Sequence, residues 1–416
     1  MRPTGAEASR LEPFGRCGPI DSMRPYVLFA AATFGFVGFA GCDSGVGRFA
    51  PNELRGVTLA AARRVDSAGN AAKDAAAVVE GWFGTPDAPK WPMVDGGGAD
   101  LVSSENLRRA AGPQASDRDD RHTGLYREHC VRCHGIDGGG AGAAALFQNP
   151  YPRNFRHGVF KWKSTERDTK PTRDDLRRVL ERGVPGSPMP SFANVSEEDR
   201  EALVGYVIYL SVRGEVERGL IAAAGDELGY GDVEASPLVG TEGQGIAREV
   251  LDEIVSDWVA AEDAVVEVPS PPEEPVVDSI AKGRDLFVGQ IANCAACHGA
   301  DGAGGITIVD YDDWAKEVST RAGIDPNDRD AMRPMRRLGA LPPRPAVPRK
   351  LTAGVYRGGA DDETLYRRLV EGIAGCPMPG VNVVDEENGR GLTSDQVWRL
   401  VRYVRSIGGV GSGGAE

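Results

Sequence analysis

One pattern occurs twice in this chain of 416 residues: a cysteine, two other residues, a second cysteine and then a histidine. The pattern comprises Cys130, Cys133 and His134 within EHCVRCHG, and Cys294, Cys297 and His298 within NCAACHG. This spacing places two thiols and an imidazole within about one turn of helix, so a bound group would be held at three points. No other feature constrains the fold as strongly.

The paired pattern is typical of a covalently attached c-type haem, in which the histidine ligates the iron. A zinc site would need further Cys or His ligands, and the chain has only five histidines. A thioredoxin-like pair would follow a strand, whereas helix-like LYREHC precedes the first copy. We therefore expect two covalent haem c groups, one at each copy.

An internal repeat follows each copy. PRNFRHGVFK from Pro152 matches PRKLTAGVYR from Pro348, and the matched segments ending in GSPMP and GCPMP align Met189 with Met378. A haem with one axial histidine has a second face to fill, and a thioether is a soft, neutral ligand that raises the reduction potential. We expect Met189 and Met378 to ligate iron opposite His134 and His298.

With these motifs the chain resembles the class I c-type cytochromes, especially membrane-attached bacterial proteins with two haem domains in tandem. The resemblance covers about residues 121–218 and 279–407 and implies an all-α fold. We expect two tandem class I cytochrome c domains joined by an acidic helical connector. The predicted ranges are a signal or lipoprotein segment (1–42), a helical or flexible tether (43–120), cytochrome c domain 1 (121–220), the connector (221–278) and cytochrome c domain 2 (279–410).

Two side chains compete as haem ligands. His157 could serve the first haem, but its repeat partner is Ala353, so we interpret it as a surface residue. Cys376 stands where the first copy has Ser187. A thiolate ligand there would lower the reduction potential, but free cysteine behaves as a small hydrophobe, and we favour that interpretation.

The second domain carries an insertion of roughly residues 306–343, which lies between His298 and Met378. It contains Met332 and Met335, which lack the repeated loop and rank below Met378 as ligands. The insertion either covers a haem edge, forms a docking surface, or is a solvated loop with one helix.

Helix signals mark the last helix of each domain. The runs SEED from Ser196 and TSDQ from Thr393 each have the form of a capping box. In the family that the chain resembles, this helix crosses the helix that enters the haem motif. The expected crossing contacts are Tyr126 with Tyr206 and Phe287 with Tyr403.

The N-terminal region has an apolar run of 16 residues, Tyr26 to Gly41, that ends in FAGC. The run is short for a transmembrane helix and suits a signal sequence. The ending resembles a bacterial lipoprotein cleavage box, which predicts lipidation of Cys42. The alternative is an uncleaved anchor. Under both interpretations the chain is exported and is attached to a membrane on the periplasmic side.

The net charge of −13 is concentrated in the connector. Residues 220–279 contain fifteen acidic residues against the single base Arg248, which leaves the rest of the chain near +1. No basic stripe dominates, so we expect no nucleic-acid partner. A helix in the connector would place Ile246, Val250, Ile254, Val255 and Trp258 on one face, either against its own haem domain or against a partner subunit.

Electron transfer is the expected function, within a respiratory chain between a quinol-oxidising complex and a terminal oxidase, or as a subunit of either. No catalytic residue is expected. The alternatives are a dihaem enzyme, such as a cytochrome c peroxidase or a small-molecule dehydrogenase, and a haem-based sensor. An enzyme or a sensor needs an open iron position, which gas binding would reveal.

Overall fold

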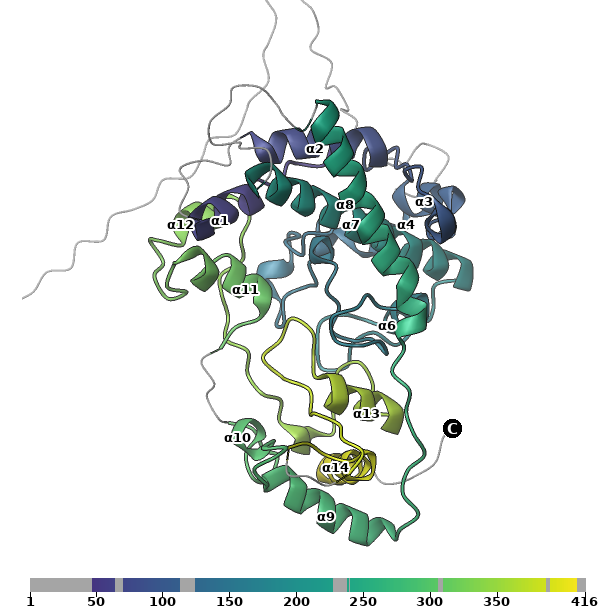
Figure 1. The fold of residues 1–416 in the computed structure, drawn as a ribbon, viewed down its shortest axis with the longest axis vertical. Helices are drawn as coiled ribbons and strands as arrows, with labels where there is room; N and C mark the ends of the chain where they lie inside the picture. The colour runs from purple at the N-terminus through teal and green to yellow at the C-terminus, as the bar shows by residue number, and fades with distance from the viewer. Residues whose placement is uncertain are drawn as a thin grey trace, which may run out of the picture. The chain divides into compact units, whose positions relative to one another are not determined.

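Helices form the regular structure of the part of the chain that can be described, which comprises residues 47–63, 70–112, 124–226, 238, 240–305, 310–386 and 390–409 of a computed structural model. These residues belong to one compact unit, Val46–Glu416. Apart from isolated β-bridges, no strand occurs within these ranges (Figure 1). The expected all-α fold is confirmed. The segment 1–42, with Cys42, lies outside the described residues.

The first haem motif lies on two short helices, α4 (Leu125–His129) and α5 (Val131–His134). They pack with η3 (Phe155–His157) and α6 (Arg173–Arg182) around the long helix α7 (Glu197–Asp226). A short turn, η2 (Ala145–Phe147), follows the motif. The rings of Tyr126 and Tyr206 lie 4.9 Å apart, so the expected crossing contact is confirmed.

The surroundings of α7 explain why its sequence is apolar on nearly every face. Helices α1 (Glu53–Arg63), α2 (Ala71–Phe83), α3 (Ser104–Ala111) and α8 (Thr241–Val259) all contact it. The turns η1 (Gly96–Asp100) and η5 (Ala260–Ala264) flank α8. A helix covered on all sides buries apolar residues all round. The described residues of the range that we expected to be a tether therefore pack in the core of the first domain.

The connector helix α8 packs on α7 rather than leaving its apolar face open. Of the face expected from the sequence, Val255 and Trp258 are buried, whereas the centre of the buried face is Ala247 and Leu251. Trp258 packs against Phe160 and donates its Nε1–H to Glu215 at 2.8 Å. Helix α8 is thus part of the first haem domain, whereas the linker that follows it contacts the second domain.

The second domain is smaller. Helix α9 (Val276–Val288) leads to the motif helix α10 (Ala295–His298), and α13 (Asp362–Glu371) precedes α14 (Ser394–Ile407). The turn η7 (Leu351–Ala353) contacts α14. Helix α14 begins with the predicted capping box at Thr393, and it crosses α9 where the rings of Phe287 and Tyr403 lie 5.3 Å apart. Both predictions are confirmed.

The insertion folds as α11 (Asp313–Glu317), η6 (Thr320–Ala322) and α12 (Arg333–Arg337). Although its sequence belongs to the second domain, it packs on α1, beside which α12 lies in Figure 1. Met332 and Met335 are buried there with Leu54 and Ala61 of α1. The insertion is therefore a packed element and not a solvated loop.

None of the helices in the described residues is long and apolar enough to cross a membrane.

Candidate haem sites

The two motif histidines are oriented by the same contact. His134 Nδ1 lies 2.9 Å from the carbonyl oxygen of Arg153, and His298 Nδ1 lies 3.0 Å from that of Arg349. Each carbonyl accepts the Nδ1–H, which leaves Nε2 with a lone pair for a metal. Arg153 and Arg349 are matched positions of the internal repeat. This contact was not predicted, although the repeat marks it by aligning the two arginines.

Burial keeps the first of these histidines neutral. Loss of solvation lowers the pKa of His134 to about 4, and the Phe155 ring stacks on its imidazole at 4.5 Å. A neutral imidazole is the form that ligates iron.

The cysteines of each motif lie on the turn that ends at the histidine. The amide of His134 donates to the carbonyl of Cys130 at 2.8 Å, and that of His298 donates to Cys294 at 2.9 Å. Burial raises the pKa of the Cys130 thiol to about 12 and that of Cys294 to about 11. The amide nitrogen of Gln148 lies 2.8 Å from the Cys133 sulfur. One turn of chain thus presents two thiols and one imidazole together.

The turn after each histidine requires glycine at one point. Gly140 donates to the carbonyl of His134, and Gly304 donates to that of His298, both at 2.8 Å. Both glycines have positive φ, 74° and 70°. A Cβ on Gly140 would lie 2.8 Å from the carbonyl oxygen of Pro152, so a larger residue would push away the segment whose next carbonyl holds His134.

The two methionine loops have the same backbone. The amide of Val184 donates to the carbonyl of Met189 at 3.1 Å, and that of Ile373 donates to Met378 at 3.0 Å. Prolines on both sides of each methionine fix φ and stiffen the loop. The equivalence that the repeat predicted is present in the structure.

A single cavity contains both sets of residues. Its volume is ≈ 1840 Å³, and its lining includes all eight predicted site residues: Cys130, Cys133, His134, Met189, Cys294, Cys297, His298 and Met378. Apolar side chains complete each half, with Leu176 and Phe192 in the first and Leu369 and Leu392 in the second. Paired thiols, an oriented imidazole, a thioether and an apolar wall fit a covalently held haem in both halves.

The domains meet at their methionine loops in a reciprocal way. A Cβ on Gly186 in the first loop would lie 3.0 Å from Val355, and one on Gly375 in the second loop would lie 3.2 Å from Val159. Gly186 is the repeat partner of Gly375, and Val159 is the repeat partner of Val355. Each domain therefore supports the other's methionine loop.

Arginines reinforce this contact. Arg167 of the first domain donates to the carbonyls of Cys376 and Met378 at 3.2 and 3.0 Å. In return, Arg357 of the second domain donates to the carbonyl of Gly186 at 3.1 Å. The loops that carry the predicted thioether ligands are thus held by hydrogen bonds from the opposite domain.

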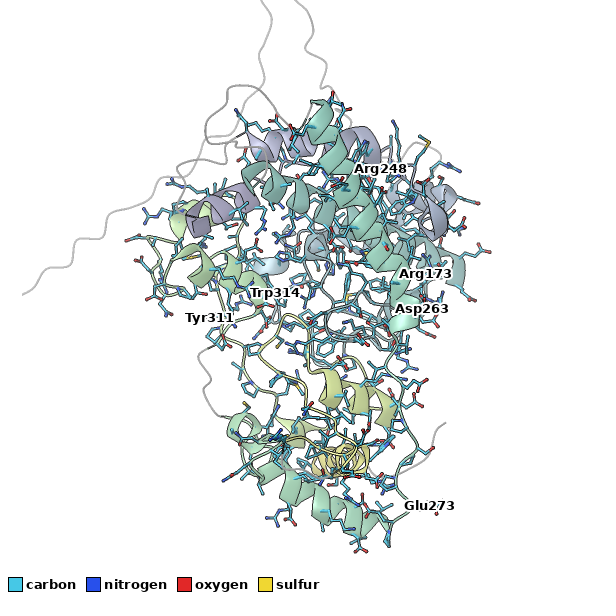
Figure 2. All side chains as sticks on the ribbon, viewed as in Figure 1. Arg173, Arg248, Asp263, Glu273, Tyr311 and Trp314 are labelled. Atoms are coloured by element: carbon cyan, nitrogen blue, oxygen red, sulfur yellow. The ribbon has the colours of Figure 1, made fainter. Side chains whose placement is uncertain are left out.

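Trp314 of α11 in the insertion lines the cavity and is labelled in Figure 2. The guanidinium of Arg153 lies 4.1 Å from one face of its ring system, and the ammonium of Lys161 lies 4.5 Å from the ring centroid. A Cβ on Gly375 would lie 2.9 Å from the same indole. The insertion therefore lines the cavity and contacts residues of both domains.

His157 is not a surface residue, and this expectation was wrong. Its side chain is 15% exposed, and its Nδ1 lies 3.6 Å from the carboxylate of Glu317, which also pairs with Arg55 and Arg218. Burial, followed by the neighbouring arginines, lowers the pKa of His157. The repeat gave no sign of this because Glu317 comes from the insertion, which has no counterpart in the first copy.

Of the rival ligands, His157 and Cys376 line the cavity, whereas the two methionines of the insertion do not. Met332 and Met335 are 2% and 3% exposed in the cluster on α1 and do not line the cavity. Burial raises the pKa of the Cys376 thiol, which favours its neutral form. Among the described residues, no group of three or more His, Cys, Asp and Glu side chains gathers as a metal site.

Comparison with known families matches the two domains separately. Residues 117–207 match the family model for cytochrome c oxidase, cbb3-type, subunit III, and residues 280–408 match the model for cytochrome c. No curated protein is similar enough to the chain to count as a match.

One solved structure, the reducing HAO-like protein complex of Kuenenia stuttgartiensis, aligns with 71% of this chain and 98% of its own, with 24% identity and a TM-score of 0.44. A likeness at this level adds nothing to the assignment. The two family matches and the all-α fold show that the chain belongs to the dihaem c-type cytochromes, whose domains bind haem c and serve electron transfer.

Proposed function

We propose that this protein is an electron-transfer cytochrome with two covalently attached haems, located on the periplasmic side of a bacterial membrane. It would pass electrons within a respiratory chain, from a quinol-oxidising complex to a terminal oxidase or as a subunit of either. The observation that carries the proposal is the pair of equivalent methionine loops facing one cavity with His134 and His298. With both axial positions filled, iron exchanges electrons without binding a substrate.

The chain's own residues hold the two sites rigid. The carbonyls of Arg153 and Arg349 orient the histidines, and the reciprocal contacts hold the methionine loops. A bound haem would supply an iron that alternates between Fe(II) and Fe(III). Fixed ligands keep the reorganisation on electron transfer small, so the protein's role is to hold them.

The membrane location rests on the sequence. The apolar run that ends in FAGC supports export, and a lipid on Cys42 would attach the chain. The partner is inferred from the first family match, whose name is that of an oxidase subunit.

Carbon monoxide binding tests whether both axial positions of each iron are filled. The reduced holoprotein is expected to bind carbon monoxide slowly or not at all, because the gas must displace a methionine. Met189→Ala should open one site and Met378→Ala the other, each giving carbon monoxide binding to half of the haem and a lower potential at that site. Met332→Ala is the matched control, since this buried methionine lies outside the cavity.

Two results would contradict the proposal. Rapid carbon monoxide binding to the unmodified protein, or peroxidase turnover, would mean that one site is open and would favour the dihaem enzyme. An intact mass without two haem increments would remove the covalent dihaem assignment.

A further inference from the structure

A groove lined by arginines lies beside the first haem site. It has a volume of ≈ 680 Å³, and α12 and the preceding turn contribute four exposed arginines to it: Arg329, Arg333, Arg336 and Arg337. Arg333 pairs with Asp330 at 2.5 Å. The other three form no ion pair within the described residues, so the groove carries an excess of positive charge in a chain of net charge −13.

The opposite wall of the groove comes from the first domain. It consists of Ala141, Gly142, Ala143 and Leu146, and the next residue, Phe147, is 88% exposed. An exposed phenylalanine beside a row of arginines has the composition of a protein interface, with an apolar centre and a polar rim.

Phe147 is exposed on a segment that is held in place. Arg344 of the second domain donates to the carbonyls of Leu146 and Gln148, on either side of Phe147. The same guanidinium lies 3.8 Å from the ring of Tyr151, whose hydroxyl donates to the carbonyl of Pro342. Both domains therefore contribute to this surface, and its backbone is ordered before any partner binds.

The surface adjoins the first haem site. Gln148, next to Phe147, contacts the sulfur of Cys133. The arginine groove and the cavity of the haem sites also share lining residues, among them Ala141, Arg337 and Leu341. A protein bound here would be close to the first haem.

We propose that the arginine groove and Phe147 form the docking surface for the acidic face of a partner redox protein, which exchanges electrons at the first haem site. This inference rests on the proposed electron-transfer function and adds its partner and its point of entry. One electron moves between the partner's metal centre and the first haem site, and no proton or bond is transferred. A small anion would use the arginines but gain nothing from Phe147.

Inorganic oxidants of opposite charge test the arginines. The reduced holoprotein is mixed with hexacyanoferrate(III), an anion, or with tris(phenanthroline)cobalt(III), a cation. Charge reversal at Arg329→Glu with Arg336→Glu should slow oxidation by the anion about tenfold at low ionic strength and speed oxidation by the cation. Both effects should vanish in about 1 M salt.

The matched control carries the same change in net charge elsewhere. Lys73→Glu with Arg108→Glu alters two exposed residues on α2 and α3 that do not line the groove. It should change both rates less than the groove variant does, because both variants share the change in net charge and only the groove variant alters the charge at the proposed docking surface. Unchanged midpoint potentials in both variants would show that the haems themselves are not perturbed.

A protein oxidant tests Phe147. Oxidised plastocyanin, an acidic copper protein, serves as the probe. Phe147→Ser should lower its rate about tenfold while leaving both inorganic rates within about twofold, since an aromatic anchor matters only for an extended interface. The Arg329→Glu, Arg336→Glu variant should lower the plastocyanin rate as well.

Three outcomes would overturn the inference. Equal effects of the groove variant and its control would show that electrons do not enter here, even if the haems still cycle. A charge effect on the anionic oxidant alone, together with no effect of Phe147→Ser on the plastocyanin rate, would make the groove a small-anion site. Salt-sensitive dimers that disappear in the groove variant would identify a second copy of this acidic chain as the occupant.

Discussion

The two haem domains have nearly the same ligand-bearing backbone but obtain their cores in different ways. In the first, α7 is enclosed by helices from before and after the domain, namely α1, α2, α3 and α8. In the second, α9 and α14 pack mainly on each other, and the linker before α9 contacts α14 through Pro269. The local pattern of a haem site is thus compatible with quite different amounts of supporting structure.

Two tryptophans show this contrast. Trp258 lies on the connector and inserts into the first domain, where it contacts Phe160 and Glu215. Trp398 belongs to the second domain and donates to the carbonyl of Pro269 in the linker at 2.9 Å. Both tryptophans are core residues, but the connector supplies Trp258 to the first domain, whereas Trp398 is the second domain's own side chain and binds the linker backbone.

The largest expected effect follows from this difference. Trp258→Ala should destabilise the first domain by about 3–5 kcal/mol, because it leaves a cavity where the buried indole packed. Hydrogen exchange followed by mass spectrometry should show faster exchange in α7 and α8 but not in α9 and α14. Trp258→Phe, which loses the bond to Glu215 but keeps a ring, should cost only about 1–2 kcal/mol. Equal loosening of both domains by Trp258→Ala would contradict separate cores.

A smaller effect is expected at the crossing of α9 and α14. A Cβ on Gly283 would lie 2.0 Å from the carbonyl oxygen of Arg399 and 2.8 Å from the Cβ of Tyr403. Gly283→Ala should therefore destabilise the second domain by about 1–3 kcal/mol, measured by thermal unfolding of the holoprotein. Gly81→Ala in α2 is the control, since no heavy atom lies within 4 Å of its added Cβ, and helix propensity should make it neutral or stabilising. A neutral Gly283→Ala would mean that the helices do not cross this closely.

The smallest effect is a pH dependence confined to the first domain. His157 is buried against Glu317 and faces Arg55, Arg156 and Arg218, and burial lowers its pKa below the ordinary value of about 6.5. Below that pH the unfolded chain takes up a proton that the native chain does not, so stability falls as the pH falls.

His157→Ala, which copies the residue of the second domain at this position, should remove up to about 1.4 kcal/mol per pH unit of that dependence between about pH 6.5 and 5. Urea unfolding at several pH values measures the slope. At pH 8 the slopes of the two proteins should agree, and a slope at pH 5 that the substitution leaves unchanged would assign the dependence to another group.

The sequence predicted features that depend on neighbours in the chain. The Cys-x-x-Cys-His turns, the proline-flanked methionines and the capping box at Thr393 are all local patterns, and each is present. The helix crossings were also predictable, because the repeat placed Tyr206 and Tyr403 at equivalent positions. At Ser196 the hydroxyl oxygen accepts the amide of Asp199, and the hydroxyl donates to the carboxylate of the same residue.

What the sequence did not reveal depends on contacts between distant segments. The burial of His157 requires Glu317, which is 160 residues away in the sequence. The buried face of α8 centres on Leu251 because that face packs on α7. The hydrophobic periodicity of the sequence was also compatible with a neighbouring face of the helix, which is the one that was predicted. The Ala-rich run from Glu53 forms α1 and α2 on α7, which no pattern within the run could indicate.

The reciprocal support of the methionine loops has a consequence for modularity. Tandem repeats suggest cassettes that can be cut apart or exchanged, but each loop here is completed by a valine and an arginine of the other domain. An excised domain would lose that support at the loop which carries its predicted iron ligand. A substitution at either valine is therefore limited by the glycine of the opposite domain.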